Sequence, residues 1–589
     1  MSLLLALYRG GWLRTVDHAL GESLRRLRPD TPDLVLAAAA LCSRAIAQGH
    51  SQLPLALVPE LLLDIGAERA LPELPPHDEW LAVLHGSPWV SLAVAGVCAS
   101  PVTPLVLEDE ALSLRRYWRY EVRLAEAIAH RLTTTATPVA AAVDARLAQL
   151  FPEDVAGAQA RTARALLGEH FLLLTGGPGT GKTTTVARAL VVFAENFPGA
   201  APTIALAAPT GKAAARLAES VRESLARLVA EGRVSEDAAR QLAPEARTLH
   251  RLLGWRPDST DFRHDAAHPL PADLVIVDEA SMIDLPLMCK LVEAVAPTAT
   301  LLLIGDRDQL PSVETGDVLA ALCDASEIAD LPPARRPTRV HLTQTHRQRA
   351  DVDVATLAAR VRDGEVEAVM SGLANDAFRG VSWRNGSDRA VADAVLAAAV
   401  PAFRRVADAP DVASALAEAR QFRVLTAVRE GAAGSQTLNG QIAAALDPAR
   451  RGSGFFHGRL VLITENSYRH GLFNGDIGIA WQEHDDASGE PSLRVWFDAD
   501  GGPRAWLPAA LPAHESAFAL TVHKSQGSEF ERVFLALPER SARVLSRELL
   551  YTGLTRCREH VTLWASEPAL REGLQRRAQR WSGLAARLR

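Results

Sequence analysis

The stretch Phe171-Leu-Leu-Leu-Thr-Gly-Gly-Pro-Gly-Thr-Gly-Lys-Thr183 decides the fold class. An apolar run typical of a buried strand passes into the pattern G-x-x-x-x-G-K-[ST], and Lys182–Phe193 continues with helical periodicity. Glycines in such a turn let backbone N–H groups surround phosphates, and the N-terminus of the helix favours their negative charge. We therefore predict a phosphate-binding loop made of Gly176, Gly177, Pro178, Gly179, Thr180, Gly181, Lys182, Thr183 and Thr184. Lys182 is expected to reach the β- and γ-phosphates, and the Thr183 hydroxyl to bind Mg²⁺.

A second acidic motif completes this prediction. Leu274-Val-Ile-Val-Asp278-Glu279-Ala-Ser281 reads as a buried strand that ends in two carboxylates. Such a strand would bring Asp278 to the Mg²⁺ ion and place Glu279 beside it as the base that orients the attacking water. The two motifs together predict hydrolysis of Mg-ATP, although they do not say what the released energy moves.

The surrounding pattern predicts a doubly wound α/β fold. Buried strands are expected at Phe171–Thr175, Thr203–Ala208, Leu274–Val277 and Thr300–Ile304, with covering helices at Lys182–Phe193 and Lys212–Leu228. A second α/β region has expected strands at Phe422–Thr426, Phe518–Val522, Val533–Leu537 and Val561–Ala565. Short strands and turns between residues 450 and 512 (Arg459–Ile463, Asn474–Asp476, Leu493–Phe497) predict an inserted small β-barrel of the SH3-like kind.

These patterns divide the chain into five segments. Residues 1–135 have helical periodicity and no chemical motif, which indicates a helical accessory or docking domain. Residues 136–345 form the first nucleotide-binding motor domain of the RecA-like kind. A second such domain is expected to consist of residues 346–449 and 513–589, with the inserted barrel at 450–512 between them.

Composition narrows the class of protein. The chain has 589 residues and a formal net charge of −7, so any nucleic-acid site must be a local groove rather than a generally basic surface. The five cysteines form no C-x-x-C pair, which argues against a zinc ribbon or an iron–sulfur cluster. No apolar run is long enough to cross a membrane, and no secretion signal is evident, so a cytoplasmic protein is expected. Only four lysines occur, and Lys182, Lys212 and Lys524 fall inside motifs.

Further motifs follow in order along the chain. Gly305-Asp-Arg-Asp-Gln309 follows an expected strand and puts Gln309 where it can sense the γ-phosphate. Thr345-His-Arg347 offers an arginine after another strand. Leu520–Phe530 and Tyr551-Thr-Gly-Leu-Thr-Arg556 complete the set near the C-terminus.

These blocks resemble motifs I to VI of the superfamily 1 helicases, across residues 159–565. In detail, the sequence of several of these segments is similar to the RecD family, the α subunits of the RecBCD exonuclease (exodeoxyribonuclease V). Four pieces carry this second resemblance: Thr175–Thr185, Val277–Pro286, Gly305–Leu310 and Gly471-Leu-Phe-Asn-Gly-Asp-Ile-Gly-Ile479. The last piece is the most discriminating, because it lies outside the common helicase motifs. One departure is His346-Arg347, where the superfamily usually has an aromatic residue before the arginine.

The resemblance implies roles for individual residues. Gln159 is similar to the residue that reads adenine, and Glu529, after Gly527, to the acid that contacts the ribose. Arg347 and Arg556 resemble the two arginines that reach the γ-phosphate across the cleft, a contact that can accelerate phosphoryl transfer strongly. The segments that resemble contacts to a DNA strand contain Pro209, Thr210, Lys212, His250, Thr521, His523, Lys524 and Ser525. Arg256–His268 is a candidate strand-separating hairpin. Trp255 before it could lie near the DNA groove, but the prediction favoured here is a partly buried position in the core.

The same resemblance implies an ATP-driven motor that moves 5′→3′ on single-stranded DNA and acts at duplex ends in double-strand-break repair. RecB-like and RecC-like subunits would complete a heterotrimer, in which the N-terminal domain is the candidate docking surface. Nuclease activity is expected in a partner, since no cluster of metal-binding carboxylates stands out beyond the ATP site. Two alternatives remain open: a stand-alone RecD-like helicase, and an ATP-dependent assembly switch that does not unwind DNA.

Overall fold

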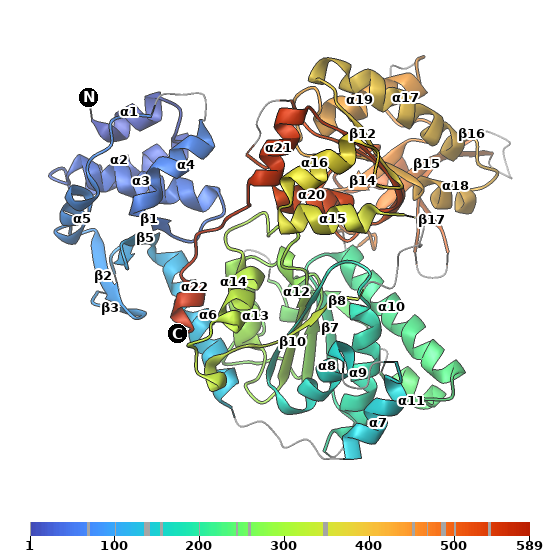
Figure 1. The fold of residues 1–589 in the computed structure, drawn as a ribbon, viewed down its shortest axis with the longest axis horizontal. Helices are drawn as coiled ribbons and strands as arrows, with labels where there is room; N and C mark the ends of the chain where they lie inside the picture. Colours follow the sequence, from blue (N-terminus) through green and yellow to red (C-terminus); the bar gives the residue numbers. More distant parts are fainter. Residues whose placement is uncertain are drawn as a thin grey trace.

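The computed structural model describes the whole chain apart from a set of short segments, and it places the described residues in three α/β parts and a small β-sheet (Figure 1). The segments not described are residues 1, 67–70, 101, 135–141, 154–156, 199–200, 243–244, 257–258, 260, 345–351, 450–453, 468, 485–490, 500–501 and 540–542. No helix among the described residues has the length and apolar character needed to cross a membrane.

The first α/β unit is built on a six-stranded sheet whose strands all run parallel, in the order β11-β6-β10-β9-β7-β8. The strands are β6 (Phe171–Gly176), β7 (Ile204–Ala208), β8 (Ala246–Thr248), β9 (Leu274–Val277), β10 (Thr300–Gly305) and β11 (Thr338–Leu342). Successive residues of a strand point to opposite faces, so Phe171 and Leu173 join one apolar core while Leu172 and Leu174 join the other.

Helices cover both faces of this sheet, as buried parallel strands require. They are α7 (Ala142–Leu150), α8 (Ala158–Gly168), α9 (Lys182–Asn196), α10 (Gly211–Ala230), α11 (Glu236–Gln241), α12 (Leu249–Leu253), α13 (Leu285–Ala294) and α14 (Val318–Glu327). The strands and helices predicted in this region are confirmed, with bounds shifted by at most three residues.

The second α/β unit has a five-stranded parallel sheet in the order β12-β21-β20-β13-β19. The strands are β12 (Val381–Arg384), β13 (Phe422–Thr426), β19 (Ala519–Thr521), β20 (Phe530–Ala536) and β21 (Cys557–Trp564). The helices are α15 (Val354–Asp363), α16 (Val366–Ala374), α17 (Asp388–Ala407), α18 (Val412–Ala419), α19 (Ser435–Leu446), α20 (Arg547–Leu554) and α21 (Glu567–Gln575). The prediction of two doubly wound α/β regions is therefore confirmed.

The segment inserted into the second unit is a five-stranded antiparallel sheet, in the order β17-β16-β15-β14-β18. The strands are β14 (Leu460–Ile463), β15 (Ile477–His484), β16 (Pro491–Phe497), β17 (Arg504–Trp506) and β18 (His514–Ser516). Leu460 and Leu462 pack on the core of the second unit, whereas Val461 and Ile463 face a small separate core. Among the described residues β17 and β18 do not pair, so the expected closed barrel is not found.

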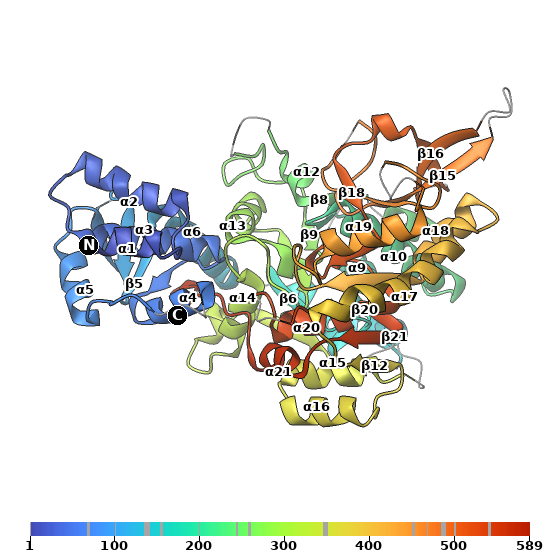
Figure 2. The same ribbon diagram turned by 90° about the horizontal axis from the view of Figure 1, so that it is seen from above.

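The N-terminal part combines helices with a sheet that the sequence pattern did not predict. The helices are α1 (Leu3–Arg9), α2 (Thr15–Leu27), α3 (Asp33–Ala47), α4 (Val58–Ile65), α5 (His77–His85) and α6 (Arg115–Thr133). The sheet has the order β1-β5-β4-β2-β3, with β1 at Leu53–Pro54, β2 at Val90–Val94, β3 at Val97–Cys98, β4 at Leu105–Glu108 and β5 at Ala111–Leu114. The helices of the predicted helical domain are present, and the sheet is an addition that the prediction lacked. Figure 2 shows this part projecting to one side of the two α/β units.

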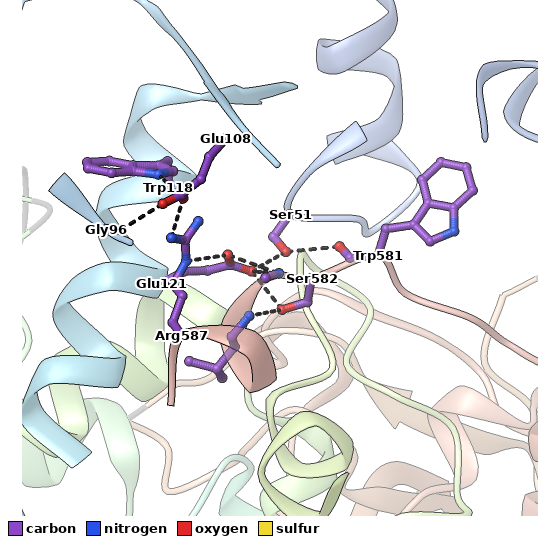
Figure 3. A network of polar contacts seen from close by, with 10 residues as sticks. Ser51, Gly96, Glu108, Trp118, Glu121, Trp581, Ser582 and Arg587 are labelled. Atoms are coloured by element: carbon purple, nitrogen blue, oxygen red, sulfur yellow. Dashed lines mark hydrogen bonds and ion pairs between the residues drawn. The ribbon is translucent and has the colours of Figure 1, made fainter. Parts of the chain in front are cut away.

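The final described segment returns from the second unit to the N-terminal part. After α21 it reaches Trp581, whose indole stacks on His50 with ring centroids 4.0 Å apart, and ends in α22 (Leu584–Arg587) beside α6. Glu121 on α6 accepts hydrogen bonds from Ser51 Oγ at 2.6 Å and from Ser582 Oγ at 2.6 Å (Figure 3). The guanidinium of Arg587 lies between Glu108 and Glu121. This buried polar network joins residues from both ends of the chain.

Candidate functional site

The predicted phosphate loop lies at the carboxyl edge of the first sheet, between β6 and α9. The end of β11 approaches it so closely that a Cβ added to Gly176 would lie 2.8 Å from the backbone oxygen of Leu342. Gly181 precedes α9 with φ of 82°, in the left-handed region that favours glycine. The geometry of the turn therefore requires glycine at both ends of the pattern.

Lys182 folds back over this loop. Its Nζ donates hydrogen bonds to the backbone oxygens of Gly176 at 2.7 Å and of Gly177 at 2.9 Å. Thr183 and Thr184 follow it, half-buried in the first turn of α9. The ammonium group and the N-terminus of the helix concentrate positive charge at one point, which is the electrostatic environment that a phosphate group needs.

Two adjacent carboxyl groups follow β9 at the same edge of the sheet. Asp278 Oδ1 accepts a hydrogen bond from the backbone N–H of Glu279 at 2.8 Å, and Glu279 has a left-handed φ of 53° that is uncommon outside glycine. Burial raises the pKa of both carboxyl groups, and the charge of Asp278 raises the pKa of Glu279 further. The positive charge of Lys182 opposes this rise in both groups.

The second unit reaches this site through α20 and the residues after it. Arg556 is 4% exposed, and its charge lowers the pKa of Glu279. Its guanidinium donates to the backbone oxygens of Thr552 at 3.1 Å and of Ser528 at 3.4 Å, so the second unit fixes its position. The structure therefore brings Arg556 close to the acidic pair, whereas Arg347 lies outside the described residues.

The turn after β10 holds the predicted phosphate sensor. Gln309 is 5% exposed, and its Nε2 donates to Asp306 Oδ2 at 3.2 Å. Its carbonyl oxygen Oε1 is buried and has no hydrogen-bond partner among the described residues. Asp306 also accepts from the Tyr551 hydroxyl of α20 at 2.9 Å. The two units thus meet through hydrogen bonds at this turn.

The residues predicted to hold the nucleoside are more dispersed. Gln159 is half-buried in the first turn of α8, which packs against α9. Glu529 forms an ion pair with Arg558 at 2.7 Å and lies 3.8 Å from a guanidinium nitrogen of Arg216. Gly527, with φ of 71°, accepts a hydrogen bond from Arg216. The expected ribose-contacting acid is therefore already paired with two arginines.

The first group of predicted DNA contacts lies between β7 and α10. Pro209 and Thr210 are half-buried, and Thr210 Oγ1 caps α10 by accepting from the Ala213 N–H at 3.2 Å. Lys212 Nζ donates to Ser528 Oγ at 2.7 Å, across the boundary between the two units. His250 is exposed in the first turn of α12. The N-terminus of α10 and the ammonium group of Lys212 therefore lie at the boundary between the two units.

The second group lies after β19. Thr521 Oγ1 accepts from the Lys524 N–H at 3.3 Å, and the exposed Lys524 pairs with Glu515 at 2.6 Å. Burial, with the nearby charge of Arg580, lowers the pKa of His523 to about 4, so its imidazole is neutral at physiological pH. Ser525 is fully buried, and its hydroxyl donates to the Val522 carbonyl at 2.8 Å. The structure does not present the Ser525 hydroxyl to a ligand.

The prediction that Trp255 is partly buried in the core is wrong. Its side chain is 53% exposed, and it forms an isolated antiparallel bridge with Phe262. Residues 257, 258 and 260 of the candidate hairpin Arg256–His268 lie outside the described part of the chain.

Several site residues have no role in the sequence-based prediction. Tyr551 and Ser528 stand inside motifs quoted for other residues, and only the three-dimensional contacts reveal their partners. The charge of Arg216 lowers the pKa of Asp278 and of Glu279, and its guanidinium lies 3.8 Å from the carboxylate of Glu529. Arg216 follows Lys212 by four positions on α10, so helical periodicity alone could have placed both on one face.

Three family models match parts of the chain. They are described as RecBCD enzyme subunit RecD, N-terminal domain (residues 9–112), AAA domain (residues 159–315) and UvrD-like helicase C-terminal domain (residues 516–564). One match lies in the N-terminal part, one in the first α/β unit and one in the C-terminal portion of the second.

Curated relatives align along most of the chain. The RecBCD enzyme subunit RecD of Mycobacterium tuberculosis is 37% identical over 595 residues, which covers 99% of this chain and 96% of the relative. The RecD subunit of Haemophilus influenzae is 32% identical, over 86% of this chain and 84% of the relative. The ATP-dependent RecD2 DNA helicase of Deinococcus radiodurans is 34% identical, over 75% of this chain and 53% of the relative. Among solved structures, Bacteroides Pif1 bound to single-stranded DNA matches with a TM-score of 0.35 and 16% identity, over 69% of this chain and 91% of that one.

Proposed function

From the premise that this chain belongs to the RecD family of RecBCD enzyme subunits, and is an ATP-dependent DNA helicase motor, we propose that it moves 5′→3′ along one strand of DNA within a heterotrimer. RecB-like and RecC-like subunits are the proposed partners, and the nuclease activity of the complex is assigned to a partner. The proposed location is the cytoplasm, where the DNA ends that need repair are found.

One observation supports the motor proposal: the residues proposed to bind ATP come from both units. The phosphate loop and the acidic pair belong to the first unit, and Arg556, whose charge acts on Glu279, belongs to the second. Phosphate between them would attract both units, and its release would remove that attraction. Hydrolysis at such a boundary can therefore change the relative position of the units, which is what stepping along a strand requires.

The residues at this site fit a magnesium nucleotide. Lys182 and Arg216 lower the pKa of both buried carboxyl groups, yet the pKa of each remains raised, so the pair can accommodate further positive charge. We propose that Asp278 and Thr183 hold Mg²⁺, which when bound would neutralise the phosphates and polarise the γ-phosphoryl group. No group of three or more His, Cys, Asp or Glu side chains suited to a metal occurs among the described residues, so the phosphates would supply the remaining ligands.

In this proposal Gln159 reads the adenine, and Gly527 and Glu529 lie beside the ribose. Glu279 orients the attacking water, Gln309 senses the γ-phosphate, and Arg347 and Arg556 stabilise the charge that develops on it. DNA would lie across the boundary at the start of α10 and the turn after β19, where Thr210, Lys212 and Thr521 come from different units. The corresponding motor domains are residues 136–345 for the first and residues 346–449 with 513–589 for the second.

The deciding experiment measures hydrolysis of ATP by the purified full chain with and without single-stranded oligonucleotide. A DNA motor should be stimulated by the oligonucleotide, whereas an assembly switch need not be. Lys182→Gln should abolish hydrolysis and unwinding but retain binding of the oligonucleotide. Lys290→Gln is the control for hydrolysis measured without oligonucleotide, since Lys290 lies over the ring of Phe262 and outside the ATP site. Unwinding of duplexes with 5′ tails but not 3′ tails would establish the polarity, and equal rates on both would refute it.

A further inference from the structure

A buried hydrogen-bonded bridge joins the two units next to the phosphate loop, and none of the roles assigned above uses it. The Tyr551 hydroxyl in α20 donates to Asp306 Oδ2 at 2.9 Å, and both side chains are 4% exposed. A Cβ built on Gly177 would lie 3.0 Å from the Tyr551 oxygen, so the phenol abuts the backbone that would surround phosphate. The bridge therefore lies at the point where nucleotide and both units meet.

Two backbone contacts accompany this bridge. The Leu310 N–H donates to Thr552 Oγ1 at 2.9 Å, and Gln526 Nε2 donates to the Leu310 oxygen at 3.2 Å. Residues 306–310 after β10 are thus held by adjacent side chains of α20 and by the turn after β19. Through these hydrogen bonds, residues 306–310 of the first unit are linked directly to the second unit.

Asp306 is the centre of the bridge because one carboxylate collects three donors. Besides Tyr551 it accepts from the Asp308 N–H at 3.1 Å and from Gln309 Nε2 at 3.2 Å. An ionised carboxylate only accepts, so it forces the Gln309 amide to turn its nitrogen inward. The carbonyl oxygen of Gln309 is then left buried without a partner among the described residues.

A carbonyl oxygen can pair with the protons of a water molecule but not with phosphate oxygens, which are themselves acceptors. The orientation that Asp306 imposes on Gln309 is thus suited to holding the attacking water beside the γ-phosphate, so Gln309 would sense the γ-phosphate through that water. Burial and the neighbouring Asp306 raise the pKa of Tyr551 well above its usual value, so the hydroxyl remains a donor throughout the physiological range.

We propose that Tyr551 is a positioning residue for ATP hydrolysis: through Asp306 it fixes the Gln309 amide so that the Gln309 carbonyl oxygen orients the attacking water only when the two units are in contact. This inference rests on the proposed function and adds to it a route from the relative position of the units to the rate of the chemical step. Tyr551 acts through Asp306 and Gln309, and makes no contact with substrate in this scheme.

The test compares Tyr551→Phe with wild type in the full chain, by steady-state hydrolysis of ATP with and without single-stranded oligonucleotide. Removing the hydroxyl deletes one hydrogen bond to a charged group, so we expect kcat to fall about 10-fold or more while KM for ATP changes less than about twofold. Tyr120→Phe is the matched control: Tyr120 is also buried, in α6, and should leave kcat unchanged.

Asp306→Asn and the double variant complete the test. Both changes interrupt the same path, so Tyr551→Phe should lower kcat much less in the Asp306→Asn background than in wild type. A wild-type kcat in Tyr551→Phe, a change confined to KM, or additive effects in the double variant would each overturn the inference. If oligonucleotide does not stimulate hydrolysis of ATP by the wild type, the motor proposal fails. The effect of Tyr551→Phe on the unstimulated rate would still decide whether Tyr551 is a positioning residue.

Discussion

The ammonium group of Lys212 donates a hydrogen bond of 2.7 Å to the hydroxyl of Ser528, so the start of α10 in the first unit is tied to the turn after β19 in the second. Both segments were predicted to contact DNA. Burial, reinforced by the charge of Arg216, lowers the pKa of Lys212 to about 8. Lys212 therefore changes charge within an accessible pH range at the boundary where DNA is proposed to lie.

Binding of DNA should add a proton to Lys212. A phosphate beside the ammonium group favours its charged form and raises its pKa. At pH 8.5 the free protein is mostly neutral at this position, so binding should take up about half a proton or more, and at pH 6.5 almost none. Calorimetry of oligonucleotide binding in two buffers of different ionisation enthalpy measures the uptake.

Lys212→Arg is the control for this experiment, because a guanidinium remains charged at both pH values. The variant should bind DNA without the pH-dependent uptake. Equal uptake by wild type and Lys212→Arg would show that Lys212 does not meet a phosphate.

Phe473 determines the effect of substituting Gly211. A Cβ added to Gly211 would lie 2.5 Å from both Cβ and Cγ of Phe473, atoms near the backbone that cannot rotate away. Gly211→Ala should therefore lower the midpoint of thermal unfolding, at a cost of about 1–3 kcal/mol. In a Phe473→Gly background, which lacks both of these atoms, the same change should raise the midpoint relative to Phe473→Gly alone, because alanine favours a helix over glycine by up to about 1 kcal/mol. The same sign in both backgrounds would contradict the contact.

The sequence was sufficient to predict the buried parallel strands, since runs such as Leu274–Val277 carry their own signal in apolar β-branched residues. It failed for β1 and β3, which have two residues each and show no periodicity. The exposure of Trp255 and the bond between Asp306 and Tyr551, 245 residues apart, depend on how distant segments pack, which no local pattern records. Residues that act within one loop were therefore predictable from local pattern. Arg556 was predicted through the family resemblance, whereas the contacts that Tyr551 and Ser528 make between the two units were not predicted.

Glu279→Gln should separate binding of ATP from its hydrolysis. The amide keeps the size of the side chain but cannot accept the proton of the attacking water, and loss of a general base costs about 10²–10⁴ in rate. Nucleotide affinity, measured with a fluorescent ATP analogue, should remain within a few-fold of wild type. Glu293→Gln is the control, since Glu293 of α13 pairs with Arg123 of α6 and has no predicted role. Hydrolysis by Glu279→Gln at the wild-type rate would remove Glu279 from the mechanism.

Arg587→Met should destabilise the protein far more than Arg571→Met, although each arginine pairs with two glutamates. The Arg587 side chain is 10% exposed, and its partners Glu108 and Glu121 are 7% and 1% exposed. Removing the cation leaves two buried carboxylates uncompensated, at a cost of about 3–5 kcal/mol. Arg571 is 35% exposed and its partners Glu367 and Glu567 are 80% and 48% exposed, so its loss should hardly shift the unfolding midpoint. Urea unfolding followed by tryptophan fluorescence compares the two midpoints. Equal shifts would mean that water reaches the network around Glu121 and that the ion pairs of Arg587 do not hold the final segment on the N-terminal part.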